Sequence, residues 1–250
     1  MEGTGGNVLL LHGFGETSSI WDAQVAALAP ICRMIIPDLP GSGKSERMDD
    51  MSIESMADAM IEIVNKEINA GDKVIVIGHS MGGYIALAVA ERHPEKLCAL
   101  GLVHSSAYAD SQEKIATRRK GIEFIKEHGA GEFLKTAIPN LFSPASKDKY
   151  PQIINDLILA GNNFSAGSLV SYYEAMINRP DRTHILKEMK IPFLFVLGKF
   201  DTAIPLKDGL SLCHMPELSY IHVLHKSGHM GMLEEADLTN RILSEFISEN

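Results

Sequence analysis

The sequence predicts an α/β fold, in which a mostly parallel sheet is flanked by helices. Short apolar runs typical of buried strands recur along the chain, and helical patterns follow several of them. With 250 residues and 45% hydrophobic side chains, the chain can form one domain with a sizeable core. We expect strands at residues 8–11, 32–37, 74–77, 98–103, 191–198 and 219–224, and helices at residues 51–69, 84–92 and 232–248.

The strand at residues 74–77 ends in the sequence GHSMG (residues 78–82), and a helical pattern follows directly. A G-x-S-x-G pattern is weak by itself. Between a strand and a helix, however, it indicates a nucleophile elbow, in which the serine sits on the sharp turn that joins them. The two glycines leave room for neighbouring backbone, so that the serine can adopt a strained conformation. The following helix N-terminus favours negative charge beside the hydroxyl group. An incidental serine in a glycine turn is the simpler alternative, but the context favours Ser80 as a nucleophile.

A serine hydroxyl needs a base to take its proton, and the base needs a third group that holds its tautomer. Asp201 lies in the loop after the fifth predicted strand, and His229 lies in the glycine-containing loop after the sixth. The order Ser, Asp, His is the one expected for a nucleophile elbow on a parallel sheet. His222 and His225 are nearby, but His229 alone has the Ser-Gly-His context just before the last predicted helix. We therefore predict a catalytic triad of Ser80, Asp201 and His229.

The chain resembles the α/β-hydrolase superfamily, in the branch that carries a helical cap. Five segments from Asn7 onward carry the resemblance, in the family's order and spacing: His12-Gly13-Phe14-Gly15, residues 38–45 (DLPGSGKS), the elbow, the Asp201 loop and Ser227-Gly228-His229. The resemblance implies an oxyanion hole formed by the backbone N–H groups of Phe14 and Met81, which would stabilise the charge that acyl transfer builds on a carbonyl oxygen. It implies no metal and no organic cofactor. His12 is expected only to hold its loop by hydrogen bonds, and His79 to act at most indirectly.

The predicted triad indicates hydrolysis of a small carboxylic ester or thioester through an acyl-enzyme. A serine at the elbow argues against dehalogenase and epoxide hydrolase chemistry, which uses aspartate there in this superfamily. Relatives with the same triad cleave carbon–carbon bonds or carry out perhydrolysis, and others are signalling receptors that bind a small ligand and turn it over slowly. Fold alone does not decide among these alternatives.

Residues 104–190, between the fourth and fifth predicted strands, are too many for a plain crossover. Helical patterns broken by prolines fill this stretch and predict a helical cap over Ser80. We expect a hydrolase core at residues 1–106 and 190–250, and a cap at residues 107–189. No charged residue stands out in the cap as an anchor for a substrate carboxylate or phosphate. Seven large side chains of the cap either line the pocket or, the more common role on amphipathic helices, pack its core: Phe124, Phe133, Phe142, Phe164, Tyr172, Tyr173 and Met176.

Charge and composition restrict the partners. A net charge of −9 argues against nucleic acid or an anionic membrane surface as the main partner. The expected partner is the small acyl substrate that the triad and the family resemblance imply. Gly43-Lys44-Ser45 resembles the end of a phosphate-binding loop, but Asp38 stands where that loop needs a glycine, so nucleotide binding is not expected. No signal peptide or membrane-spanning run of ~20 apolar residues is visible.

The cysteines and the N-terminus give two further expectations. Cys32, Cys98 and Cys213 have no metal-ligand spacing and are expected to be reduced, as in a cytoplasmic protein. Relatives usually carry a β-hairpin before the first strand, whereas this chain has only residues 1–6 there, so we expect the hairpin to be absent. The strand at residues 32–37 would then be an exposed edge, which predicts either a homo-oligomer or reduced stability.

Overall fold

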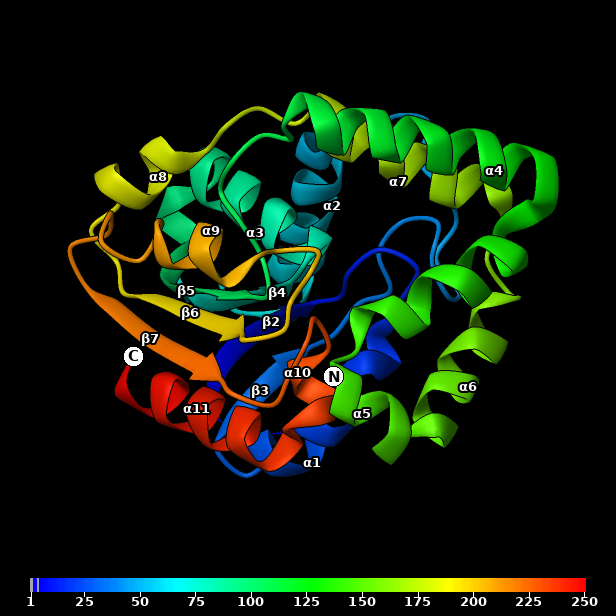
Figure 1. The fold of residues 1–250 in the computed structure, drawn as a ribbon. Helices are drawn as coiled ribbons and strands as arrows, with labels where there is room; N and C mark the ends of the chain where they lie inside the picture. Colours follow the sequence, from blue (N-terminus) through cyan, green and yellow to red (C-terminus); the bar gives the residue numbers. More distant parts are fainter. Residues whose placement is uncertain (1, 4) are drawn as a thin grey trace.

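A seven-stranded sheet forms the centre of the molecule in the described part of the chain, residues 2–3 and 5–250 of a computed structural model (Figure 1). The strand order is β1-β3-β2-β4-β5-β6-β7, and all neighbours are parallel except β1 and β3. This is the predicted fold class. The strands are β1 (Glu2–Gly3), β2 (Gly6–Leu11), β3 (Cys32–Ile35), β4 (Val74–His79), β5 (Leu97–Val103), β6 (Phe193–Gly198) and β7 (Ser219–Leu224).

Helices cover both faces of the sheet, as crossover connections between parallel strands require. On one face α1 (Asp22–Leu28) lies beside α11 (Ala236–Glu249), and on the other α2 (Ile53–Glu67) packs against α3 (Met81–Arg92) (Figure 1). Every residue of β4 is buried, which explains its unbroken run of aliphatic side chains. Four short elements complete the core: η1 (Ser18–Trp21), η2 (Pro94–Lys96), α9 (Leu206–Leu210) and α10 (Gly231–Glu234).

A helical insertion connects β5 to β6, as predicted for a cap. Figure 1 shows α4 and α7 lying along one another, outside the layers that enclose the sheet. The long helix α4 (Gln112–Ala137) is kinked at Gly129, which has the non-helical angles φ 88° and ψ 168°. The insertion contains α4 (Gln112–Ala137), η3 (Ile138–Leu141), α5 (Pro144–Lys149), α6 (Pro151–Gly161), α7 (Ala166–Asn178) and α8 (Thr183–Glu188).

The predicted helix at residues 232–248 is broken in two. Glu235, between α10 and α11, has the non-helical angles φ −130° and ψ 53°. Its carboxylate accepts hydrogen bonds from the Lys226 N–H (2.8 Å) and from the Ser227 hydroxyl (2.8 Å). These contacts hold the loop that carries His229 against the start of α11. The helical periodicity of the sequence could not reveal this break, because its cause is a contact with another loop.

The strand β3 is not the bare edge that the sequence predicts. The two residues of β1 pair with it in antiparallel register, with Glu2 opposite Met34 and Gly3 opposite Arg33. The expectation of an exposed edge is therefore wrong at these two positions of β3. Because the N–H and C=O groups of an edge strand are what a second chain would pair with, β1 reduces the surface available for association there.

Within the described ranges, no helix is both long and apolar enough to cross a membrane. All three cysteines are free thiols; Cys32 and Cys213 are buried, whereas Cys98 is half-buried. Burial raises the pKa of the Cys32 and Cys213 thiols to about 11, so that both are protonated and unreactive at neutral pH.

Candidate active site

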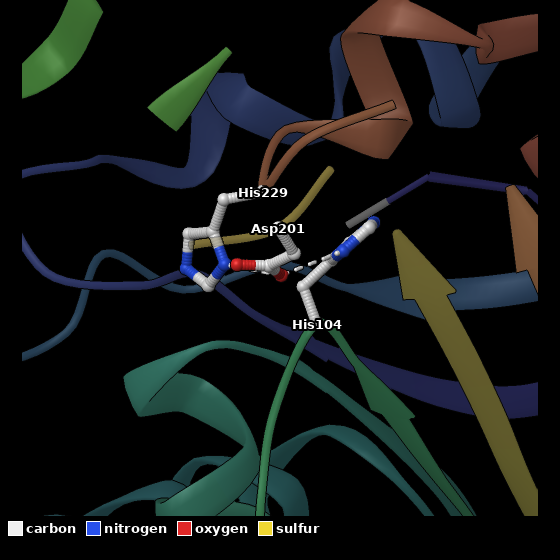
Figure 2. Close-up of side chains that lie close together, drawn as sticks. All are labelled: His104, Asp201 and His229. Carbon is white, nitrogen blue, oxygen red and sulfur yellow. Dashed lines mark hydrogen bonds and ion pairs between the residues drawn. The ribbon is translucent and has the colours of Figure 1, made fainter. Parts of the chain in front are cut away.

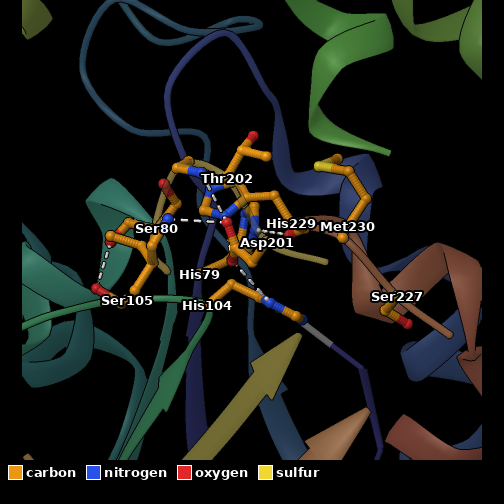
Figure 3. Close-up of polar contacts among 12 residues, drawn as sticks. His79, Ser80, His104, Ser105, Asp201, Thr202, Ser227, His229 and Met230 are labelled. Atoms are coloured by element: carbon orange, nitrogen blue, oxygen red, sulfur yellow. Dashed lines mark hydrogen bonds and ion pairs between the residues drawn. The ribbon is translucent and has the colours of Figure 1, made fainter. Parts of the chain in front are cut away.

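Ser80 occupies the sharp turn between β4 and α3, with φ 50° and ψ −115°. A side chain at Gly78 would meet the backbone of Gly82, and one at Gly82 would meet the backbone of β2, so both positions need glycine. Two hydrogen bonds hold the strained turn in place. The Ser80 N–H donates to the Val103 carbonyl (3.0 Å), and the Ser105 hydroxyl donates to the Ser80 carbonyl (2.7 Å), as Figure 3 shows for the second. The predicted elbow geometry is therefore present.

Asp201 and His229 meet at the carboxyl ends of β6 and β7. The His229 Nδ1 lies 2.8 Å from the Asp201 Oδ2, and both side chains are buried. An ionised carboxylate only accepts hydrogen bonds, so Nδ1 carries the proton and Nε2 keeps a lone pair. His229 and Ser80 line the same cavity. The structure thus brings the three predicted residues to one place.

Asp201 also contacts a second imidazole, that of His104, and the sequence analysis did not predict this contact. Figure 2 shows its carboxylate between His229 and His104, and the His104 Nδ1 lies 3.2 Å from the same Oδ2. The other oxygen, Oδ1, accepts from the N–H groups of Ala203 (2.9 Å) and Ile204 (2.8 Å). Burial opposes ionisation of Asp201, but the electrostatic interaction with His229 and the hydrogen bonds from His104 and His229 hold the pKa of the carboxyl below its usual range.

His104 is neutral. Burial lowers its pKa, and the interaction with Asp201 does not compensate. It has the positive φ of 48°, and within the described residues its buried Nε2 has no hydrogen-bond partner. With Nδ1 protonated toward Asp201, the imidazole is a fixed donor to the carboxylate. One feature of the sequence could have pointed to His104: it directly follows β5, the strand that pairs with β4 of the elbow.

His104, Asp201 and His229 also carry the donor atoms of a metal site, with one such atom from each lying within 4.8 Å of the others. In the structure these atoms are hydrogen-bonded to one another, at 2.8 and 3.2 Å. A cation would need both nitrogens deprotonated and the two hydrogen bonds given up. The donor set therefore fits a hydrogen-bonded network better than a metal centre.

Two backbone N–H groups fit the predicted oxyanion hole. Met81 is the first residue of α3, where a helix has no internal acceptor for its N–H groups. Phe14 follows Gly13 in the loop after β2, and its side chain lines the cavity beside Ser80. Among the described residues, neither amide donates to a protein acceptor. Both are therefore available to a carbonyl oxygen at Ser80.

A buried ion pair between Glu16 and His79 supports both the loop after β2 and the loop that carries His229, which we call the histidine loop. The Glu16 Oε2 accepts from the Gly13 N–H (2.6 Å) and from the His79 Nδ1 (2.9 Å), and the His79 Nε2 contacts the His229 carbonyl (2.9 Å). Both nitrogens of His79 face acceptors, so both are protonated. Burial opposes the charges, but mutual attraction raises the pKa of His79 and lowers that of Glu16. The sequence analysis gave His79 an indirect role and missed Glu16.

His12 has the structural role expected of it. Its Nε2 accepts from the Leu39 N–H (2.9 Å), so its Nδ1 is protonated and donates to the Gly13 carbonyl (2.9 Å). Burial lowers the pKa of His12 and keeps the ring neutral. The ring joins the loop after β2 to the loop after β3.

The histidine loop is bound to the end of η3. The His229 N–H donates to the Leu141 carbonyl (2.7 Å). The Glu234 carboxylate bridges the two segments, since it accepts from the Gly228 N–H (2.8 Å) on one oxygen and from the Ser143 N–H (2.8 Å) on the other. This part of the insertion is therefore fixed to the core beside His229.

The cavity above Ser80 has a volume of about 160 Å³. Its size is small beside the ~300–1,000 Å³ of sites for drug-sized ligands, which indicates a short substrate. Of the seven cap residues singled out in the sequence, Phe133, Tyr173 and Met176 line it. The others do not: Phe142, Phe164 and Tyr172 are buried in the core, and Phe124 is partly exposed. The sequence analysis missed Arg118 of α4, which also lines the cavity.

Comparison with known proteins agrees with this architecture. The sequence profile of the family described as alpha/beta hydrolase fold matches residues 6–236. A pimeloyl-[acyl-carrier protein] methyl ester esterase of Vibrio cholerae is 25% identical over 98% of this chain and 96% of its own length. A 2-hydroxy-6-oxononadienedioate/2-hydroxy-6-oxononatrienedioate hydrolase of Pseudomonas putida is 27% identical over 96% of this chain and 87% of its own.

Among solved structures, a thermophilic esterase from Thermogutta terrifontis with malate bound superposes with a TM-score of 0.93. It is 29% identical, and the match covers 99% of this chain and 91% of the esterase. The fold and the family match define the class of protein: the chain belongs to the alpha/beta hydrolase fold family. It is a hydrolase, similar to proteins that are named esterases and hydrolases.

Proposed function

We propose that the protein hydrolyses a small carboxylic ester or thioester with a triad of Ser80, His229 and Asp201. The observation that carries the proposal is the shared cavity of Ser80 and His229, with the Asp201 carboxylate 2.8 Å behind the imidazole. A nucleophile, a base and an orienting acid in this relation are the requirements of acyl transfer. The esterases among its relatives support the same reaction class.

The reaction takes place in two halves. In the first, His229 Nε2 takes the Ser80 hydroxyl proton while Oγ attacks the carbonyl carbon, and the N–H groups of Phe14 and Met81 bind the oxyanion. The imidazolium, stabilised by Asp201, then protonates the leaving alcohol or thiol as its bond to the acyl carbon breaks. In the second half, His229 deprotonates a water that attacks the acyl-enzyme. Collapse returns the proton to Ser80 and releases the acid.

The division of the chain is part of the proposal. Residues 1–106 and 190–250 form the hydrolase core, and residues 107–189 form the cap that closes the cavity. Phe133, Tyr173 and Met176 of the cap line the cavity, which is why the acyl specificity is assigned to this segment. The cytoplasmic location expected from the free cysteines stays a prediction.

A series of p-nitrophenyl esters of increasing acyl length tests the function. We expect a burst of one nitrophenol per active site, an optimum at short acyl length, and no turnover by Ser80→Ala. Ser19→Ala, which changes an exposed serine outside the site, is the matched control. A fluorophosphonate should label the parent and the control on Ser80, with loss of fluoride, and leave Ser80→Ala unlabelled. Wild-type activity in Ser80→Ala would refute the proposal.

Carbon–carbon bond hydrolysis is the second candidate, because a relative acts on 2-hydroxy-6-oxononadienedioate. A protein that is labelled on Ser80 but turns over no ester of the series should then be tested on such dienedioates. Hydrolysis of the dienedioate, with no hydrolysis of any ester in the series, would select the second candidate.

A further inference from the structure

The cavity beside Ser80 contains an unbalanced positive charge. Among the described residues that line it, Glu16 and Arg118 are the two with a permanently charged side chain. The Glu16 charge is balanced by protonated His79 at 2.9 Å and by the Gly13 N–H at 2.6 Å. Glu16 therefore contributes little field to the cavity, and Arg118 is the charge that a substrate would meet.

The acid beside Arg118 is shared with a second arginine. The Arg118 Nε donates to the Asp110 Oδ2 at 2.5 Å, and the Arg179 Nη2 lies 2.9 Å from the Asp110 Oδ1. All three side chains are largely buried, with exposed fractions of 18% for Arg118, 0% for Asp110 and 4% for Arg179. One carboxylate thus faces two guanidinium groups, and the cluster carries a net charge of about +1.

The two arginines differ in the donors that remain. Arg179 donates from Nη1 to the Met176 carbonyl (2.6 Å) and from Nη2 to the Tyr108 carbonyl (2.9 Å), and it lies over the ring of Tyr84 at 3.8 Å. Arg118 uses Nε and Nη2 on Asp110, which leaves its Nη1 group without a protein acceptor in the described residues. The excess charge and the free donors are therefore both on the arginine that lines the cavity.

A largely buried guanidinium group needs acceptors for its N–H groups, and a carboxylate matches its planar fork. Tyr173 holds the group in place from one side, since the Arg118 carbon Cζ lies 5.4 Å from the centre of its ring. We propose that Arg118 binds a carboxylate of the substrate, so that the preferred ester is a small one with a second, anionic group. This inference rests on the proposed function, because the ester itself must reach Ser80.

Matched pairs of esters test the inference. Monomethyl adipate is compared with methyl hexanoate, which has the same acyl length and no carboxylate; half-esters of succinate, glutarate and pimelate vary the distance. Acetyl lactate and isopropyl acetate form a second pair, in which the carboxylate lies on the alcohol side. We expect Arg118→Gln to lower kcat/KM for the charged member of at least one pair about 10- to 100-fold, with the neutral member changed less than about threefold.

The neighbouring residue provides the matched control. Arg119 is exposed on the same helix, so Arg119→Gln makes the same change of charge outside the cavity and should leave both members of each pair unchanged. Arg118→Lys keeps the charge but not the fork, and its loss for the charged ester should be intermediate. An equal loss for charged and neutral esters in Arg118→Gln, in both series, would overturn the inference.

Binding without turnover separates this inference from the proposed function. In Ser80→Ala, titration calorimetry with adipate and glutarate should detect binding that Arg118→Gln in the same background abolishes. If no ester is hydrolysed but the dicarboxylate binds through Arg118, the function proposed for Ser80 fails and the anion site remains. If esters are hydrolysed and dicarboxylate binding does not depend on Arg118, the anion site is wrong and the function stands.

Discussion

The ring of Phe14 is stacked on the ring of Tyr173, with centroids 4.4 Å apart and planes 10° from parallel. Phe14 belongs to the loop after β2, and we assign its backbone N–H to the oxyanion hole. Tyr173 belongs to α7 of the cap. Both side chains line the cavity. The contact between core and cap is therefore made at the wall of the site itself, where a shift of either ring changes the shape of the cavity.

Removing the ring at position 173 should weaken both the fold and substrate binding. For Tyr173→Leu we expect a loss of about 1 kcal/mol in the free energy of unfolding, as is typical of an aromatic pair. KM for short esters should rise more than kcat falls, because the chemical groups at Ser80 are not touched. Denaturant unfolding and steady-state kinetics measure the two effects. Tyr173→Phe keeps the stacked ring and serves as the control; an equal loss in it would contradict this reasoning.

The buried pair of Glu16 and His79 should make stability depend on pH. The raised pKa of His79 stabilises the fold at pH values below the ordinary histidine pKa of 6.5. This stabilisation is lost as the pH rises through the raised pKa of His79. The lowered pKa of Glu16 stabilises the fold at pH values above the ordinary glutamate pKa of 4.5. This stabilisation is lost as the pH falls through the lowered pKa of Glu16. The contribution is therefore largest between pH 4.5 and 6.5.

Glu16→Gln tests this directly, since it leaves the histidine buried without its counter-charge. We expect the variant to lose ~3–5 kcal/mol of unfolding free energy near pH 5.5, and less at high pH, where His79 is neutral in both proteins. Urea unfolding at several pH values measures the difference. A difference that is the same at pH 5.5 and pH 9 would show that the pair is not charged. Asp22→Asn, an exposed acid at the start of α1, is the control.

Asp201 and His104 should differ sharply in their effect on activity. An amide has one accepting oxygen and one donating NH2 group, so at position 201 it cannot accept both from the imidazoles and from the backbone N–H groups. Asp201→Asn should therefore lower kcat by about 10⁴-fold through the wrong His229 tautomer. His104→Leu removes one of four donors to the carboxylate and should cost less than about tenfold. Steady-state kinetics distinguishes the two. A loss in His104→Leu as large as that in Asp201→Asn would mean that His104 takes part in proton transfer.

The short strand β1 can be tested for its role at the edge of the sheet. Deleting residues 1–5 removes β1 and exposes the edge of β3 at Arg33 and Met34, which β1 otherwise covers. We expect the full chain to be monomeric by light scattering, and the shortened chain to associate with increasing concentration. A stable monomer in both cases would show that β1 does not protect this edge, and a dimer of the full chain would restore the association expected from the sequence.

The elements and the central residues of the site could be predicted because their signals are local. The run of β-branched residues, the paired glycines and the helix after Ser80 lie within one stretch of chain, and Asp201 and His229 each follow a recognisable strand. Parallel strands bring their carboxyl ends to the same edge of the sheet, so these three signals suffice to place the residues together.

The contacts that the sequence did not reveal join residues far apart in the chain. His79 and Glu16 are 63 positions apart, and His104 and Asp201 are 97 positions apart. No periodicity encodes such pairs, since they depend on how loops from different strands meet. Arg118 was hidden for a related reason: its helix has charged residues on several sides, and only the packing of the cap decides which of them faces the cavity.

The hydrogen bonds of Leu141 and Ser143 to the histidine loop set a limit on redesign of the enzyme. A new cap grafted from another hydrolase must present a carbonyl to the His229 N–H and an N–H to Glu234, or the catalytic base loses two of its supports. A graft should therefore keep residues 141–143 and exchange the helices of the cap on either side of them. The acyl specificity, which Phe133 before this segment and Tyr173 and Met176 after it help to shape, can thus be varied without loss of these supports of His229 as long as residues 141–143 are retained.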